Sequence, residues 1–333
     1  MSNFPEMDPQ EHRLCVRVSK LYYEAELTQQ EIAKKLGVSR IKIHRTLNRA
    51  KEMGIVEIKV HAPENAKFIE QEHRLTLKYN LRDALVVPAP EEGGGYYGVL
   101  AQGASRWLES KLEPGTRIGL GLGRTISHIP RFFTVTQKMD CTFMEVVGGS
   151  SEHSGGIAKY NVTSKMAEIA GGRAELFYAP NFVSSSELRD NLISEPSIAA
   201  ALERARHCDI VIQSVGTVDE TAILYIEDRI SRMDLTRLQK SGAVGDALGN
   251  YFDAEGHPVS TFLDNRVIGL SLGDLQKIPW SVVVAGGTEK HRPVRAGLMG
   301  GYFNVLVTDT QTASYLLLDK IQTGLDSRER LLC

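Results

Sequence analysis

The chain has 333 residues, of which 42% are hydrophobic and 24% charged, and its formal net charge is −2. This is the composition of an ordinary soluble globular protein, long enough for a small recognition module with one large domain or for two comparable domains. It excludes a membrane span, because no run reaches about 18 apolar residues, and the polar, acidic N-terminus lacks the apolar centre of a signal peptide. Four widely spaced cysteines predict reduced thiols, no metal site and a cytoplasmic location: Cys15, Cys141, Cys208 and Cys333.

The charge is unevenly distributed. Residues 1–60 contain eleven Lys/Arg and eight Asp/Glu, a net of +3, so the remainder must carry −5 to give the total of −2. Seven basic side chains lie between Lys34 and Lys51 with no acidic residue among them. Such a local positive field favours an anionic partner at one end of the protein. A non-specific DNA-packaging protein is disfavoured, because the rest of the chain is acidic.

The basic segment has the pattern of a helix-turn-helix. A T-x-x-E capping box at Thr28 starts a helix that Gly37 ends, and Ser39 caps a second helix that runs to about Met53. The segment "GIVEIKV" that follows predicts a short wing or lead-out strand. Upstream, apolar residues at helical spacing predict a supporting helix: Leu14, Val18, Leu21 and Tyr22.

The second of these helices has two distinct faces when it is unrolled at 100° per residue. The stripe expected to face the supporting helices contains Ile43, Thr46, Leu47 and Ala50. The opposite face is typical of a helix that enters the major groove, where arginine can reach guanine, asparagine can pair with adenine and an isoleucine can touch a thymine methyl. The predicted DNA-binding set is Thr28, Gln29, Ser39, Arg40, Ile41, Lys42, His44, Arg45, Asn48 and Arg49, with phosphate contacts from Lys34, Lys35 and Lys51. The alternative is a solvated charged face, and the apolar Ile41 can be incidental.

Beyond residue 61 the pattern changes. Residues 62–80 predict a linker helix, with Phe68, Leu75 and Leu77 as packing residues. Residues 81–333 alternate apolar β-like runs such as "CDIVIQSVG" with helical stretches, which indicates an α/β domain with a mainly parallel sheet covered on both faces. The predicted organisation is therefore a helix-turn-helix domain (1–61), a linker helix (62–80) and an effector domain (81–333).

Glycine-rich motifs follow three of the predicted strands: "GLGRT", "VGGSS" and "AGGTEK". Ligands of open parallel sheets collect at the carboxyl ends of strands, where glycines allow close approach and amides at a helix start can face an anion. The cationic side chains suit a phosphate, and a carboxylate at Asp246 suits sugar hydroxyls. The alternative is turn glycines and surface charges. The predicted effector-binding set is Gly121, Gly123, Arg124, Thr125, Gly148, Gly149, Asp246 and Lys290, with His128, Asn161, Asn265 and Arg266 as weaker candidates.

The segment "YYEAELTQQEIAKKLGVSRIKIHRTLNRAKEMGIVEI" resembles the DNA-binding segment of SorC-type (SorC/DeoR) bacterial transcriptional regulators. The similarity continues through "IGLGLGRT", "VVGGSS", "SGAVGDALGNYFDAEG", "RVIGLSLGDLQKIP" and "VAGGTEKHRPVRAGLMGGYFNVLVTD". The resemblance implies an effector domain related to sugar-phosphate isomerases and coenzyme A transferases, binding of a sugar or sugar phosphate, and a tetramer whose affinity for operator DNA changes with ligand. His44 stands where a small hydroxyl residue is common, so no operator sequence is carried over.

The leading hypothesis is a ligand-responsive regulator of transcription that binds double-stranded operator DNA and needs no cofactor. The alternative is an enzyme, a sugar-phosphate isomerase or aldolase that carries a DNA-binding head. A lysine in the pocket could form a Schiff base with an open-chain sugar. No nucleophile–base pair or closely spaced carboxylate pair is visible in the sequence, although distant residues can meet in the fold.

Overall fold

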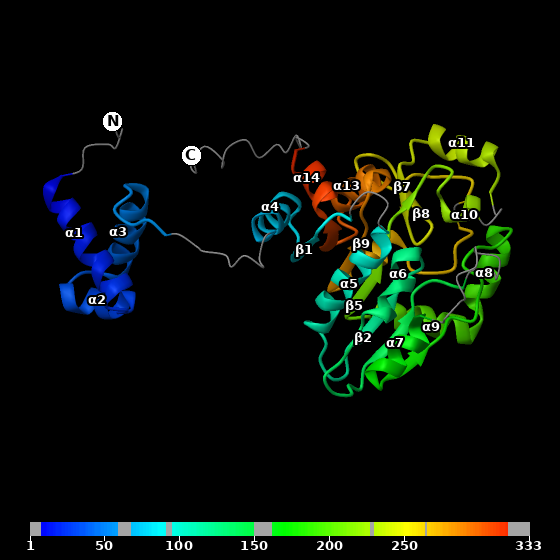
Figure 1. Ribbon diagram of the computed structural model, residues 1–333, viewed down its shortest axis with the longest axis horizontal. Helices are drawn as coiled ribbons and strands as arrows, with labels where there is room; N and C mark the ends of the chain where they lie inside the picture. The colour runs from blue at the N-terminus through cyan, green and yellow to red at the C-terminus, as the bar shows by residue number, and fades with distance from the viewer. Residues whose placement is uncertain are drawn as a thin grey trace. The chain divides into compact units, whose positions relative to one another are not determined.

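A computed structural model describes residues 8–58, 68–90, 95–149, 162–226, 230–263 and 265–318. The chain divides into two compact units, Met1–Asn65 and Ala66–Cys333. The first unit is helical and the second combines helices with strands (Figure 1). Over the described ranges, none of the helices has both the length and the apolar character needed to cross a bilayer.

The first unit is built from three helices around one small core. The helices are α1 (Pro9–Ser19), continued by a π-helical turn (Lys20–Glu24), α2 (Gln29–Leu36) and α3 (Arg40–Glu52). The buried side chains that hold them together are Val18, Ile32, Ala33, Ile43 and Leu47. The predicted stripe of the second helix is confirmed, because Ile43, Thr46, Leu47 and Ala50 are all buried.

Local capping explains where the two helices begin and end. The Thr28 hydroxyl accepts the amide N–H of Glu31 at 3.3 Å, and the Glu31 carboxylate accepts the amide N–H of Thr28 at 2.8 Å. The amide N–H and the hydroxyl of Thr28 both donate to the Glu31 carboxylate, and these two bonds lower the pKa of Glu31. Gly37 ends α2 with a left-handed φ of 67°, and the Ser39 hydroxyl accepts the amide N–H of Lys42 at 3.2 Å. The predicted capping box and both predicted starts are confirmed.

The wing expected after α3 does not form in the described part of the first unit. Gly54 adopts a left-handed φ of 68°, and the amide N–H groups of Ile55 and Val56 both donate to the carbonyl of Ala50. These amides close the end of α3, so they are not available to a strand ladder. Residues 59 and 60 of the expected strand lie outside the described ranges.

The second unit contains a seven-stranded sheet in the order β1-β10-β9-β5-β2-β3-β4, in which every pair is parallel. The strands are β1 (Asp83–Val87), β2 (Arg117–Leu120), β3 (Thr142–Glu145), β4 (Arg173–Glu175), β5 (Ile210–Gln213), β9 (Trp280–Val284) and β10 (Val305–Asp309). Because all of the strands run the same way, their carboxyl ends meet at one edge, with β5 at the centre. The predicted parallel sheet is confirmed.

Helices cover both faces of this sheet. One core contains the inward side chains of α5 (Tyr96–Glu109) and α7 (Val162–Ala170), and the other contains those of α4 (Ile69–Tyr79), α13 (His291–Met299) and α14 (Thr310–Leu318). The remaining helices are α6 (Arg124–His128), α8 (Ser186–Ser194), α9 (Pro196–Arg206), α10 (Ile223–Ile226), α11 (Arg232–Lys240) and α12 (Leu272–Leu275), with 3-10 turns at Ile129–Arg131 and Thr288–Lys290.

A second, antiparallel sheet of three strands has the order β6-β7-β8. It consists of β6 (Gly216–Thr217), β7 (Gly245–Ala247) and β8 (Asn250–Phe252). Its first strand begins three residues after the end of β5, so the small sheet adjoins the carboxyl edge of the large one. The Asp246 carboxylate lies directly against Gly216, where a side chain on the glycine would collide with it.

The helix expected as a linker is part of the second unit. In α4, Leu75 is fully buried, the Glu72 carboxylate accepts the amide N–H of Val86 at 2.9 Å, and the Tyr79 hydroxyl donates to the carbonyl of Leu316 at 3.1 Å. Leu75 packs as predicted, whereas the prediction for Leu77 is wrong, since it is 70% exposed on the outer face of the helix. Residues 62–67 of the predicted linker lie outside the described ranges.

Candidate DNA-recognition surface and effector site

The outer face of α3 exposes the side chains predicted to contact DNA. Ile41 is 66% exposed, and the exposed polar members of the set are Arg40, Lys42, His44, Arg45 and Asn48. Arg49 and Gln29 are half-buried. A helix with this face and a capped N-terminus is suited to lie in the major groove, with its first residues near the base edges.

Some of the predicted DNA-binding residues are already engaged within the protein. The Thr28 hydroxyl both donates to and accepts from Glu31, so it serves the start of α2. Arg49 forms an exposed ion pair with Glu52, with 3.4 Å between Nη1 and Oε2. His44 and Asn48 are joined at 3.3 Å, which makes His44 Nε2 the acceptor of the Asn48 amide N–H. Arg40, Lys42 and Arg45 are therefore the better candidates for direct contacts.

Ile41 carries the first testable prediction. Because its apolar side chain is exposed on the recognition face, we expect it to contact a thymine methyl. Replacement Ile41→Ser should relax the preference at a single A·T position by about 1–3 kcal/mol. Selection from a randomised operator library measures this directly. A variant with the wild-type preference at every position would remove the role.

The candidate effector site lies at the carboxyl edge of the parallel sheet, where β9, β5 and β2 are neighbours. The segment Gly121–Arg124 follows β2, and the segment Gly286–Lys290 follows β9. The Lys290 Nζ donates to the carbonyl of Val215, just beyond the end of β5, at 2.9 Å. Segments that follow three adjacent strands thus lie at one edge, and two of them, after β2 and β9, carry predicted glycine motifs.

Lys290 and Asp246 share one electrostatic environment at this edge. Burial lowers the pKa of Lys290, although Asp246 opposes the shift. Burial raises the pKa of Asp246, opposed by the Gly249 amide N–H at 2.8 Å and by Lys290. Arg124 also acts on Lys290 and lowers its pKa, so the sequence-distant residues of the predicted site are brought near one another. The site offers cationic donors for a phosphate or hydroxyl and a carboxylate acceptor for hydroxyls.

Two residues at this site were missed by sequence reasoning. The Arg124 guanidinium lies over the ring of Tyr97, with 5.0 Å from Cζ to the ring centroid. The second residue is Asp219, whose charge raises the pKa of Lys290. Burial raises the pKa of Asp219 itself, but hydrogen bonds from Thr221 and Thr217 outweigh this effect and lower it. The sequence carries a weak signal for each, since Tyr97 opens a helix after a glycine run and Asp219 lies in a short polar "TVDET" segment.

Several predicted residues have structural roles. The amide N–H groups of Gly121, Gly148 and Gly149 donate to the carbonyls of Ile212, Ile268 and Ala179, each at 2.9 Å, so these amides do not face a ligand. A side chain at Gly148 would collide with the carbonyls of Ala179 and Pro180, whereas Gly123 needs its φ of 141°. Thr125 is buried, with 5% of its surface exposed.

The weaker candidates differ in their surroundings, and of those that the structure describes only His128 lies beside Arg124 and Tyr97. The Arg266 Nε donates to the carbonyl of Val183 at 2.9 Å, and its guanidinium lies over the ring of Phe182. The His128 Nδ1 bonds to the carbonyl of Arg124 at 2.7 Å, and Asn265 adopts a left-handed φ of 56°. Asn161, like the serines of "VGGSS", lies outside the described ranges.

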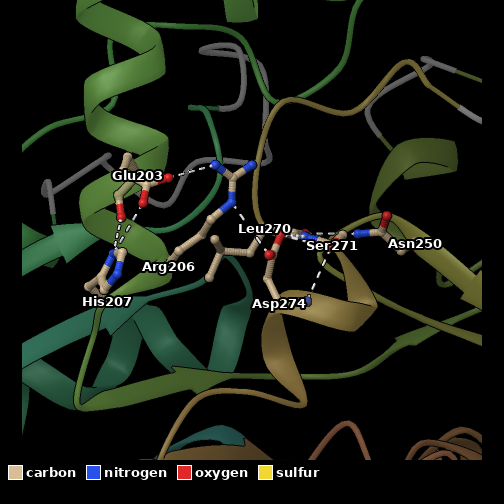
Figure 2. A network of polar contacts seen from close by, with 7 residues as sticks. All are labelled: Glu203, Arg206, His207, Asn250, Leu270, Ser271 and Asp274. Atoms are coloured by element: carbon tan, nitrogen blue, oxygen red, sulfur yellow. Dashed lines mark hydrogen bonds and ion pairs between the residues drawn. The ribbon is translucent and has the colours of Figure 1, made fainter.

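The β7–β8 turn, which follows Asp246, is held by a polar network that begins at Asn250 (Figure 2). The Asn250 side-chain N–H donates to the carbonyl of Leu270 at 3.1 Å and to that of Ala247 at 3.2 Å. Ser271 next caps α12 in a capping box with Asp274, which in turn pairs with Arg206 of α9 at 3.4 Å. The network therefore joins the β7–β8 turn to the outer helix α9. Within the described ranges, no group of three side chains is arranged to hold a metal ion.

A capped helix with a basic outer face in one unit and a group of charged side chains at the carboxyl edge of a parallel sheet in the other are typical of a DNA-binding protein with a separate ligand-binding domain. The comparisons identify its family. Residues 64–318 match the Sugar-bind family of sugar-binding domains, and residues 9–52 match Sigma-70, region 4. The chain belongs to the SorC/DeoR-type family of sugar-binding transcriptional regulators.

The relatives cover almost the whole chain. Transcriptional regulator LsrR of Escherichia coli K12 is 31% identical over 92% of this chain and 95% of its own length. The deoxyribonucleoside regulator of Bacillus subtilis is 29% identical over 94% of this chain and 100% of its own. The crystal structure of the full-length sorbitol operon regulator SorC from Klebsiella pneumoniae superposes with a TM-score of 0.69 at 25% identity, covering 92% and 99% of the two chains.

These findings confirm the predicted family and fold class, and they confirm a transcriptional regulator with a DNA-binding helix-turn-helix and a sugar-binding domain. The enzyme alternative is not favoured, because the relatives are named as regulators.

Proposed function

We propose that the regulator binds a sugar, polyol or sugar phosphate at the carboxyl edge of its parallel sheet, and that this ligand changes the affinity of α3 for operator DNA. The observation that carries the proposal is that Lys290 bonds to the Val215 carbonyl and Asp246 lies against Gly216, both just beyond the end of β5, while Arg124 follows the adjacent strand β2. The two cations offer donors to a phosphate, and the carboxylate accepts from hydroxyls. The ligand has only to bind one arrangement of the protein better than another. A difference of about 1–3 kcal/mol would change DNA affinity about 5–150-fold.

Regulation through DNA spacing requires more than one recognition helix. We propose a tetramer that acts in the cytoplasm, with the helix-turn-helix domain at residues 1–61 and the effector domain at residues 81–333. In helix-turn-helix dimers the two recognition helices must match about one turn of the duplex, ~34 Å. Because α4 is packed on the effector domain through Leu75, a rearrangement between effector domains would be passed to the segment before it.

A thermal-shift screen of the full-length protein tests this function. The probes are ribose, glucose and sorbitol, each beside its terminal phosphate ester, and 2-deoxyribose with its 5-phosphate. A true effector at 100 times its Kd should stabilise the folded state by about 2.7 kcal/mol. We expect the phosphorylated members to give the larger shifts, and the best of them to alter operator binding. The absence of any shift across the panel, or a shift with no effect on DNA binding, would contradict the proposal.

A further inference from the structure

Gln213 is a buried polar residue with no hydrogen-bond partner. It is the last residue of the central strand β5, and its side chain is completely buried. Among the described residues, neither its Oε1 nor its Nε2 has a partner. Val211 and Val215, two residues before and after it, belong to the buried core on one face of the sheet. An apolar side chain would therefore suit the packing at position 213 better than an amide does.

The surroundings of Gln213 place it at the candidate effector site. The carbonyl of Val215, two residues later, accepts the hydrogen bond of the Lys290 ammonium. A Cβ placed on Gly121 would lie 2.8 Å from Gln213 Cβ and 3.0 Å from Leu248 Cδ2, so the start of the Gln213 side chain and the tip of Leu248 both lie beside the bare backbone of Gly121. Leu248 follows Asp246 by two residues in the β7–β8 turn. Gln213 is thus adjacent to the segments that carry both Lys290 and Asp246.

Energetics distinguish Gln213 from ordinary buried polar residues. Burying an amide without partners destabilises the folded state, because the water that it loses is not replaced. Such groups are rare in native proteins, and each requires an explanation. Leu248 adds a second unfavourable feature, since it holds a left-handed φ of 52° without being a glycine. Unfavourable features that cluster at one place are typical of a site whose ligand relieves them.

We propose that Gln213 is an effector-binding residue, whose amide pairs with neighbouring hydroxyls of the sugar after the β7–β8 turn moves Leu248 away from it. The side chain supplies one acceptor and two donors, which matches a pair of hydroxyls that each donate and accept. The Asn250 amide, which donates to the carbonyl of Leu248 at 3.3 Å, holds the turn in its present position. This inference rests on the proposed function. It adds to the site a residue that recognises the positions of the hydroxyl groups of the sugar rather than the charge of a phosphate.

The full-length variant Gln213→Leu tests the inference, because leucine has a similar volume and no polar atom. Without ligand, we expect its melting temperature to rise by about 2–4 °C, since the unpaired amide is gone. Its affinity for the best-stabilising probe of the panel should fall about tenfold, which corresponds to about 1.4 kcal/mol. Its ligand-free operator affinity should equal that of the wild type. Calorimetric unfolding, ligand titration and operator-binding assays measure the three quantities.

Ser281→Ala is the matched control. Ser281 is equally buried at the start of β9, the opposite end of the strand from the site, and its hydroxyl donates to the carbonyl of Tyr302 at 2.7 Å. Because this hydroxyl is paired, its removal should lower the melting temperature and leave probe affinity unchanged. Opposite changes in melting temperature, with probe affinity lowered only in Gln213→Leu, would distinguish an amide that binds ligand from a buried group that only stabilises the fold.

The outcomes distinguish this inference from the function on which it rests. A lower melting temperature for Gln213→Leu overturns the inference, and so does a higher one combined with wild-type affinity for a probe that binds. Probes that lack one hydroxyl refine the result: the analogue missing the hydroxyl read by Gln213 should bind the wild type and the variant equally. If all such analogues lose affinity equally in both proteins, the inference is also overturned. A panel with no binder at all overturns the proposed function itself.

Discussion

Arg45→Ala should abolish operator binding while leaving the thermal stabilisation by effector intact. Arg45 is exposed on the outer face of α3, away from the buried stripe, so its loss should not disturb the helical core. An arginine that reads guanine contributes about 1–3 kcal/mol, and two half-sites double the effect. Even the lower figure gives a loss of about 30-fold in affinity. Operator-binding titrations at fixed salt, with a thermal-shift assay in parallel, measure both properties.

The control for this variant is Lys34→Ala. Lys34 is exposed in the last turn of α2 and is predicted to contact phosphate rather than a base edge. Its loss should weaken binding to all sequences alike and reduce the salt dependence of binding by about one unit per contact. If Arg45→Ala behaved in the same way, without any change in sequence preference, base readout by Arg45 would be excluded.

Lys290→Ala should have the reverse effect, with operator binding retained and effector binding lost. The ammonium donates to the Val215 carbonyl, and its charge opposes the effect of burial on the pKa of Asp246, so its removal deletes a cationic donor and that opposing charge. We expect ligand affinity to fall at least about tenfold, since hydrogen bonds to charged groups contribute about 1.5–3 kcal/mol. Operator binding should then no longer respond to effector.

Lys277→Ala provides the matched control for Lys290, because Lys277 is an exposed lysine in the same unit, before the start of β9. It should keep wild-type affinity for both ligand and operator. Equal loss of both activities in Lys290→Ala, or in Arg45→Ala, would contradict two separate binding modules. A Lys290→Ala variant that keeps its ligand affinity would exclude the cationic pocket.

The sequence alone predicted the elements whose causes are local. The capping box at Thr28, the left-handed stop at Gly37 and the cap at Ser39 act within a few residues, so their pattern is readable along the chain. The buried stripe of α3 follows from helical periodicity in the same way. The alternation of apolar strands and helices likewise predicted the parallel sheet, and the strand-end glycine motifs led to the prediction that the carboxyl edge of this sheet carries the effector site.

Only the tertiary structure decided which distant residues become neighbours, because this depends on the order of the strands in the sheet. Arg124, Gln213 and Lys290 are far apart in the sequence, and they become neighbours because β2, β5 and β9 are adjacent in the sheet. Within the described residues 55–58 the expected wing is absent for a similar reason, since the amides after Gly54 donate back to α3 instead of pairing with a strand. Gln213 has no sequence signature. A glutamine becomes notable only when its side chain is buried and its amide lacks hydrogen-bond partners, and the sequence shows neither property. Burial and pairing are properties of the packed fold, and one-dimensional periodicity does not encode them.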